Sequence, residues 1–176
     1  NLGIMYGMGK NKLMAELGLM KDVAEKLIKN YHQRAPFVKM LSEAVSRRAE
    51  DSGKIRTIGG RLCHFDLWEP HGFGIKKPLP HADALRKHGP GIKRAFTYKA
   101  LNKLIQGSAA DMTKLSMLAL YREGVIPHIQ IHDELDISVA SLQESDKIIR
   151  IMEEAVQLQV PNKIDLEQGD SWGDIH

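Results

Sequence analysis

Apolar residues follow a helical period through the first third of the chain. Residues 1–19 predict a broken helical stretch, because glycines interrupt the pattern near its start. Residues 20–34 predict a helix with one apolar face, made by Val23, Ala24, Leu27, Ile28 and Tyr31. Pro36 suits the first turn of a further helix, which we predict over residues 36–48.

The pattern changes to alternation at Lys54. Residues 54–66 alternate about Gly59 and Gly60, which predicts a β-hairpin with a tight glycine turn. Residues 68–91 contain many Pro, Gly and His residues without a period, which predicts a loop or a small insertion. The histidines there raise the question of zinc, but no known ligand spacing fits His71, His81 and His88.

The longest helical pattern covers residues 95–122 and stops before Gly124. Steps of four and three residues predict one buried stripe, made by Leu101, Ile105, Ser108, Met112, Leu115 and Ala119. Two β-branched runs over residues 129–139 then meet at a charged turn, and residues 142–157 predict a last helix. The expected fold class is therefore α+β, with a helical first part, a long helix and an antiparallel hairpin.

Composition is that of an ordinary globular chain. The 176 residues fit one domain or a piece of a larger one, with 43% apolar and 27% charged residues. Neither a membrane-crossing apolar run nor a secretory leader is visible in the sequence. Cys63 is the single cysteine, which excludes an internal disulfide and fits a reducing, cytoplasmic location.

Charge is distributed unevenly along the chain, although the formal net charge is only +3. Most basic residues lie between positions 10 and 103, including Arg47, Arg48, Lys54, Arg56, Arg61, Lys93 and Arg94. The last third, from Glu123, is acidic overall. This asymmetry suits a phosphate-facing half and a metal-facing half, while a solvated basic helix face is the alternative for any one cluster.

The charged turn His132-Asp133-Glu134 is the main candidate for chemistry. Strands hold a ligand direction rigidly, so a hairpin with carboxylates at its tip can aim them at a divalent cation. A polar hairpin turn without function is the alternative for this tripeptide taken alone.

Three segments in order carry a family resemblance: residues 1–7 (NLGIMYG), the Gln-Gly-Ser-Ala-Ala-Asp run over 106–111, and the His-Asp-Glu turn. Together they resemble the C-terminal part of the family A (DNA polymerase I-like) DNA polymerases, of a phage-like kind. The 54–66 hairpin also resembles the family's Gly-x-x-x-Thr-x-x-Gly-Arg segment. The resemblance implies three parts: partial fingers helices (1–53), the hairpin with its insertion (54–94), and the C-terminal palm (95–176).

The resemblance implies template-directed addition of deoxynucleotides to a primer 3′ end with two Mg²⁺ ions. Asp133 matches the second catalytic aspartate, and Glu134 an auxiliary residue of the metal site. Because neighbours on a strand point to opposite faces, we expect Asp133 to be the direct ligand. The first aspartate would precede Asn1, so we expect a fragment or a split polymerase that is inactive alone, from a bacterium or a phage-infected cell.

The expected partners are primer–template DNA, deoxynucleoside triphosphates, and an N-terminal polymerase segment or split partner chain, with no membrane. On the nucleotide side, Tyr6 matches a family tyrosine near the templating base, and Leu2 stands where the family has Phe or Tyr. A buried fingers aromatic is the alternative for Tyr6. His132 resembles the residue near the primer terminus, and a turn histidine satisfied by water is its alternative.

Asn102 and Gln106 are four apart and share one helix face. Their amides can donate to minor-groove acceptors that all base pairs carry, which checks pair geometry without reading sequence. An exposed amide pair without function is the alternative. One turn before this pair, Tyr98 stands where the family has an arginine that contacts the primer, so this contact is left open. On the 54–66 hairpin, Arg56 and Arg61 could reach backbone phosphates.

Two other functions compete with the polymerase. One is a non-catalytic nucleic-acid-binding module, which would explain the basic half. The other is a metal-dependent phosphohydrolase built on Asp133, Glu134 and histidines. Neither predicts the Gln-Gly-Ser-Ala-Ala-Asp segment upstream of the hairpin.

Overall fold

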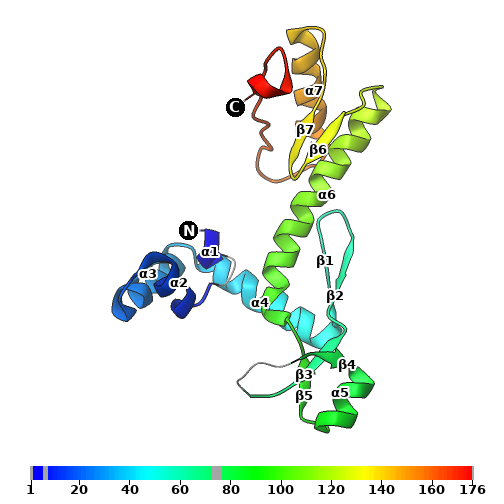
Figure 1. The fold of residues 1–176 in the computed structure, drawn as a ribbon. Helices are drawn as coiled ribbons and strands as arrows, with labels where there is room; N and C mark the ends of the chain where they lie inside the picture. The colour runs from blue at the N-terminus through cyan, green and yellow to red at the C-terminus, as the bar shows by residue number, and fades with distance from the viewer. Residues whose placement is uncertain (1, 6–7, 73–76, 176) are drawn as a thin grey trace. The chain divides into compact units, whose positions relative to one another are not determined.

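A computed structural model describes residues 2–5, 8–72 and 77–175 of the chain. The chain forms two compact units, Asn1–Gln106 and Gly107–His176, and helix α6 (Ala100–Arg122) runs from the first into the second. The predicted α+β class is confirmed, since the described residues combine helices with three small antiparallel sheets (Figure 1). No helix in this part of the chain is long and apolar enough to cross a membrane.

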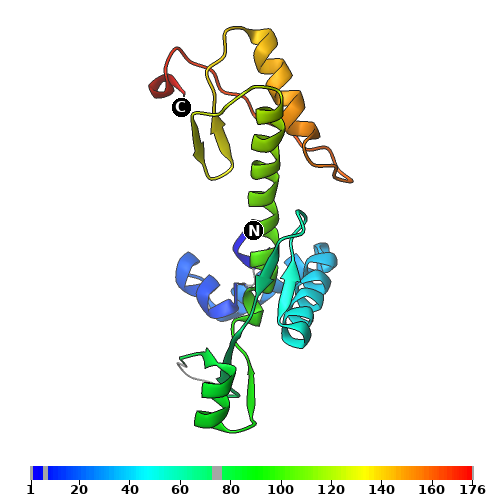
Figure 2. The ribbon, with the colours of Figure 1, turned by 90° about the vertical axis from the view of Figure 1, so that its right-hand side faces the viewer.

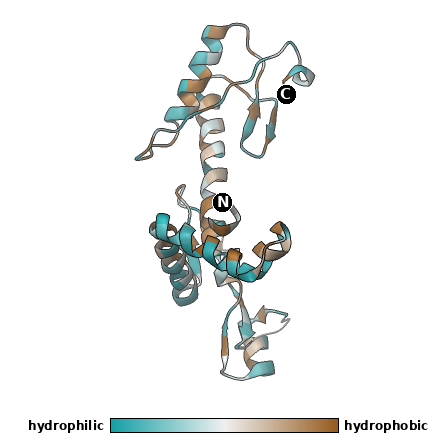
Figure 3. Cartoon of the chain, turned by 90° about the vertical axis from the view of Figure 1, so that its left-hand side faces the viewer, coloured by the Kyte–Doolittle hydropathy of each residue, from teal (hydrophilic) through white to brown (hydrophobic). Residues whose placement is uncertain are grey.

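The first unit opens with four helices: α1 (Leu2–Met5), α2 (Lys10–Leu17), α3 (Lys21–Arg34) and α4 (Pro36–Ser52). Polar and apolar residues alternate along α2, α3 and α4, as expected for amphipathic helices (Figure 3). Lys10 Nζ donates to Glu25 Oε1 at 2.7 Å, which ties α2 to α3 and lowers the pKa of the Glu25 carboxyl. Helix α4 continues past the predicted end at Arg48 to Gly53, whose left-handed backbone (φ 70°) stops it.

The predicted hairpin is formed by β1 (Lys54–Arg56) and β2 (Leu62–His64), with Ile55 opposite Cys63. Its connection, residues 57–61, is longer than the tight glycine turn expected from the sequence. The Thr57 N–H donates to the Arg61 carbonyl at 2.9 Å, and Gly60 takes the left-handed conformation (φ 86°) that closes the loop.

Of the two alternatives for residues 68–91, a loop or a small insertion, the described residues fit the small insertion. They contain β3 (Leu67–Pro70), β4 (Leu79–Pro80), α5 (His81–His88) and β5 (Ile92–Arg94), with strand order β4-β3-β5. Strands this short show no alternation, and β3 pairs with the distant β5, so local sequence could not reveal them. Trp68 anchors the sheet between the edge of His81 (4.7 Å between ring centres) and the Arg94 guanidinium (4.6 Å).

The first unit has a small apolar core where α4, the β1–β2 hairpin and the start of α6 meet. Ala49, Ile55, Phe65 and Ala100 are buried there, with Val45, Cys63 and Leu104 packed against them.

The predicted start of the long helix at residue 95 is wrong. Phe96 adopts a left-handed backbone (φ 63°), so a 3₁₀ turn, η1 (Thr97–Lys99), precedes α6.

The second unit contains the rest of α6, β6 (Ile129–Ile131), β7 (Glu134–Asp136), α7 (Leu142–Glu154) and the 3₁₀ turn η2 (Trp172–Asp174). The hairpin and α7 lie beside the C-terminal part of α6 (Figure 2). Leu120 of α6 packs with Ile148 and Met152 of α7 to form the core. The Ser141 side chain caps α7 by accepting from the Glu144 N–H at 3.2 Å.

The predicted buried stripe on α6 is only partly right. Leu101 is buried, but Leu115 is 37% exposed, and the buried residues of α6 in the second unit are instead Asp111, Thr113, Ser116 and Leu120. Ser116 remains compatible with burial because its hydroxyl donates to the Met152 carbonyl at 3.5 Å.

Candidate functional site

The His-Asp-Glu segment forms the tip of the β6–β7 hairpin. Ile131 lies opposite Glu134, so His132 and Asp133 make a two-residue turn. His132 has a positive φ of 52°, as the first central residue of a type II′ hairpin turn does. Gln130 Nε2 donates to the His132 carbonyl at 3.0 Å, which braces the turn. The backbone therefore fixes the direction in which Asp133 leaves the hairpin.

Two carboxylates at this tip are available to a ligand. The side chains of Asp133 and Glu134 are both exposed, and within the described residues neither carboxylate makes a hydrogen bond or an ion pair. Carboxylate oxygens are the donors that Mg²⁺ prefers, usually one or two of them together with substrate phosphates. No three His, Cys, Asp or Glu side chains in the described part of the chain lie close enough to hold a metal together. The turn can thus supply part of a magnesium shell.

Asp136 is a third carboxylate of this hairpin, further along β7. It is half-buried, and its Oδ2 is buried without a hydrogen-bond partner among the described residues. It lies opposite Ile129 in the hairpin, and its backbone carbonyl accepts from the His128 N–H at 2.9 Å.

The predicted amide face lies on α6, in the first unit. Asn102 and Gln106 stand one turn apart; Gln106 is exposed, and Asn102 Oδ1 is buried without a partner among the described residues. Tyr98 is 69% exposed and lies in η1, before α6 begins, with Lys99 Nζ 5.7 Å from its ring. The helix places the two residues one turn apart, and their joint contact with the minor groove stays a prediction.

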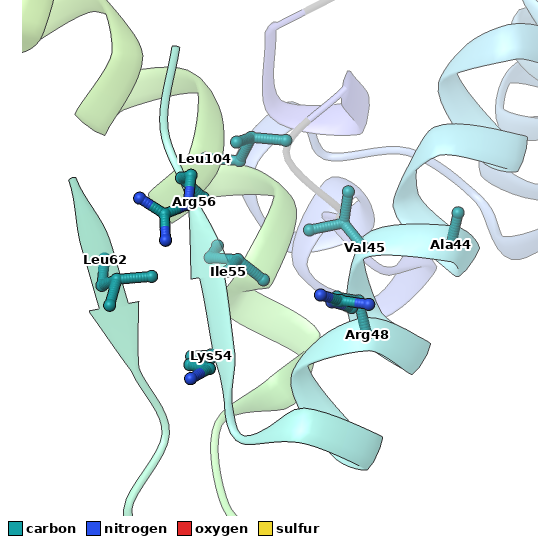
Figure 4. Close-up of a pocket in the computed structure, with 8 residues that line it drawn as sticks. All are labelled: Ala44, Val45, Arg48, Lys54, Ile55, Arg56, Leu62 and Leu104. Carbon is teal, nitrogen blue, oxygen red and sulfur yellow. The ribbon is translucent and has the colours of Figure 1, made fainter. Parts of the chain in front are cut away.

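The predicted phosphate contacts lie on the β1–β2 hairpin. Arg56 Nη1 donates to the Gly60 carbonyl at 2.6 Å, so one of its donors holds the turn, and Arg61 is exposed. Arg56 shares a groove of about 280 Å³ with Arg48 and Lys54 (Figure 4). Sequence reasoning counted Arg48 and Lys54 only as part of a basic stretch. Alternation around Ile55 could have paired Lys54 with Arg56, but nothing local pointed to Arg48.

Arg94, another residue of the basic stretch, is committed to the fold. Its Nε donates to the Glu50 carbonyl at 3.1 Å and its Nη1 to the Phe65 carbonyl at 3.0 Å. Likewise, His81 of the histidine-rich segment packs against Trp68.

The nucleotide-binding roles expected for Tyr6 and Leu2 stay predictions. Tyr6 lies outside the described residues. Leu2 begins α1, but its side chain also lies outside the described part of the chain.

The family model and the relatives found by comparison with known proteins agree on one family. The family described as DNA polymerase family A matches residues 1–174. A DNA-directed DNA polymerase of Pseudomonas phage M6 is 30% identical, and the alignment covers 98% of this chain and 28% of the relative. DNA polymerase I of Lactococcus lactis subsp. lactis is also 30% identical, with 98% of this chain and 19% of the relative covered.

A solved structure has the same fold. It is described as the POL domain of Pol1 from M. smegmatis in complex with DNA primer–template and dNTP. The match has a TM-score of 0.70 and 26% identity, and it covers 99% of this chain and 29% of that chain. The chain thus spans between about a fifth and a third of the length of these relatives.

Proposed function

We propose that this chain, which belongs to DNA polymerase family A, supplies part of the fingers and the C-terminal palm of a template-directed DNA polymerase. The observation that carries the proposal is the braced turn that presents Asp133 and Glu134 without partners among the described residues. The phage relative is a DNA-directed DNA polymerase, and the structural relative was solved with primer–template and dNTP. We extend these partners to this chain.

Asp133 is the residue we assign to Mg²⁺, with Glu134 in an auxiliary role. The donor set fits, because exposed carboxylates complete a magnesium shell together with nucleotide phosphates and water. Bound there, two Mg²⁺ ions would supply charge stabilisation for the attacking and leaving oxygens of nucleotidyl transfer. The role of this chain is to hold the Asp133 carboxylate oxygen in a fixed direction at the primer end.

A second carboxylate must come from elsewhere in the polymerase. The family takes it from a palm strand that precedes the segment matched by this chain. We therefore propose that the chain works with that polymerase segment, either in one polypeptide or as a split partner. His132, at the same turn, would lie near the primer terminus, while Gln106 and Asn102 would contact the minor groove.

The test is primer extension by the complete polymerase that contains this chain. Asp133→Asn should lower the single-turnover rate of nucleotide addition by at least a factor of about 1,000, roughly 4 kcal/mol, while primer–template binding is kept. Asp165→Asn, which removes an exposed carboxylate from the C-terminal tail, is the matched control and should leave the rate unchanged.

Each other outcome counts against a part of the proposal. Retained turnover in Asp133→Asn would remove Asp133 from the metal site and make Glu134 the next candidate. Absence of nucleotide addition in the unmutated polymerase, with DNA binding intact, would favour the non-catalytic nucleic-acid-binding module.

A further inference from the structure

A basic groove lies in the first unit, between α4 and the β1–β2 hairpin (Figure 4). Its volume is about 280 Å³. The lining comes from three places along the chain: helix α4, the two strands of the hairpin, and Leu104 of α6. All of these residues belong to the first unit, so the groove shares none of its residues with the His-Asp-Glu turn.

Every charged residue that lines the groove is a cation. Arg48, Lys54 and Arg56 are exposed, and none of the three pairs with a carboxylate in the described part of the chain. Arg56 uses one donor on the Gly60 carbonyl and keeps further guanidinium N–H groups. Three unpaired cations around one hollow favour an anion with more than one charge or a chain of phosphates.

The floor of the groove is apolar and rigid. Ile55 is 4% exposed and belongs to the core of the first unit, against which Val45 and Leu104 pack. A strand and two helices hold these residues, so the groove does not have to form on binding. A small hydrated anion would leave this apolar floor unused. An occupant that combines negative charge with a carbon-rich body matches both features.

We propose that this groove binds the sugar–phosphate backbone of one DNA strand, with phosphates at Arg48, Lys54 and Arg56 and a deoxyribose against Ile55 and Leu62. A volume near 300 Å³ lies at the lower limit of small-molecule sites, which suits about one nucleotide unit of a longer strand. The inference rests on the proposed function only for the choice of DNA; the groove itself is independent of nucleotide addition.

The experiment measures binding of the 176-residue chain to a fluorescently labelled DNA 20-mer, single-stranded or as the duplex of the same sequence, over a range of salt concentrations. The test variant is Arg48→Gln/Lys54→Gln, because Arg56 also holds the hairpin loop. The control is Lys26→Gln/Lys29→Gln, two exposed cations of α3 whose removal changes the net charge equally. Circular dichroism establishes that each variant is folded.

Loss of two phosphate contacts should reduce the magnitude of the negative slope of log K against log salt by about 1.4 for the single strand and about 1.8 for the duplex. Affinity at low salt should fall on the order of ten-fold, and the control should keep the slope of the unmutated chain. A change on the single strand alone assigns the groove to unpaired DNA, and a change on both assigns it to the backbone of either form.

A second variant protects the test against misfolding. Ala44→Glu keeps all three cations and adds a carboxylate at an exposed helical position on the rim, where glutamate is well tolerated. It should weaken DNA binding several-fold. Unchanged slopes in Arg48→Gln/Lys54→Gln, an equal change in the control, or no effect of Ala44→Glu would overturn the proposal.

The readout also separates this proposal from the proposed function. If Asp133→Asn leaves nucleotide addition intact in the complete polymerase, the assignment of Asp133 to Mg²⁺ is contradicted. The DNA-binding measurement on the groove is not affected by that result.

Discussion

At the scale of single residues, the turn contains an uncommon backbone conformation at a candidate functional position. His132 has a φ of 52°, a region in which a side chain costs about 1 kcal/mol and glycine costs nothing. The type II′ geometry normally selects glycine at this position. Gln130 partly compensates by donating to the His132 carbonyl. Because histidine occupies this position despite the cost, we infer that its imidazole has a functional role in the polymerase.

The first prediction is that His132→Gly leaves the 176-residue chain as stable as before, or up to about 1 kcal/mol more stable, because the backbone cost is relieved. His132→Ala should be about 1 kcal/mol less stable than His132→Gly. Urea unfolding measures both. Gln130→Gly is the control and should destabilise, since it removes a side-chain hydrogen bond from a strand. Equal losses for both glycine variants would contradict the account of the turn.

The candidate site could be predicted from sequence only where its residues are neighbours in the chain. His132, Asp133 and Glu134 are consecutive, and Asn102 and Gln106 are one helical turn apart, so motif and period sufficed. The groove could not be predicted, because Arg48 joins Lys54 and Arg56 only through the packing of α4 on β1. Whether the predicted residues act as assigned stays a prediction.

At the scale of elements, Arg94 ties three segments of the first unit together. Its guanidinium donates to carbonyls at the end of α4 and at Phe65, and it lies over the ring of Trp68 in β3. Gly53 makes room for it, since a Cβ there would lie 2.6 Å from Arg94 Cζ. Long helices and the two hairpins were predictable from local period, whereas the β4-β3-β5 sheet depends on such distant contacts.

The second prediction therefore concerns the stability of the chain. Arg94→Ala should lower the free energy of unfolding by about 2–4 kcal/mol, because two charged hydrogen bonds and a cation–π contact are lost. Arg86→Ala, which removes only an exposed ion pair with Asp83, should change it by less than about 1 kcal/mol. Chemical denaturation decides; similar losses in the two variants would mean that Arg94 does not tie these segments together.

The third prediction belongs to α6. In the complete polymerase, Gln106→Ala should impair extension from all four correct terminal pairs to a similar degree, because the minor-groove acceptors are shared. Extension from mismatched or freshly paired termini should be impaired most, since the geometric check is weakened. Steady-state extension from matched and mismatched primers measures both. A loss confined to one base pair would show that Gln106 reads sequence instead.

At the scale of the whole molecule, the chain matches its family over residues 1–174 yet spans only 28% of the phage relative. Its two units each have their own small core. Three basic residues of the first unit line a groove, and two exposed carboxylates of the second unit lie at the turn of a hairpin. That the basic part faces phosphates and the acidic part faces metal stays a prediction.

The fourth prediction is that the 176-residue chain adds no nucleotides by itself. One aspartate of the proposed pair is present as Asp133, and Mg²⁺ held by a single turn lacks the second set of ligands. Primer extension with the purified chain should stay at background, and addition of the polymerase segment with the first aspartate should raise it. Robust extension by the chain alone would contradict the division of the site.

The central claim is that the β6–β7 turn holds the metal of nucleotide addition, and iron-mediated backbone cleavage tests it most directly. In the complete polymerase with primer–template and nucleotide, Fe²⁺ replaces Mg²⁺ and, with ascorbate and peroxide, cuts the polypeptide next to the bound ion. We predict cleavage at residues 131–135, suppressed by excess Mg²⁺ and by Asp133→Asn but not by Asp165→Asn. Cleavage confined to other segments, or unchanged in Asp133→Asn, would contradict the account.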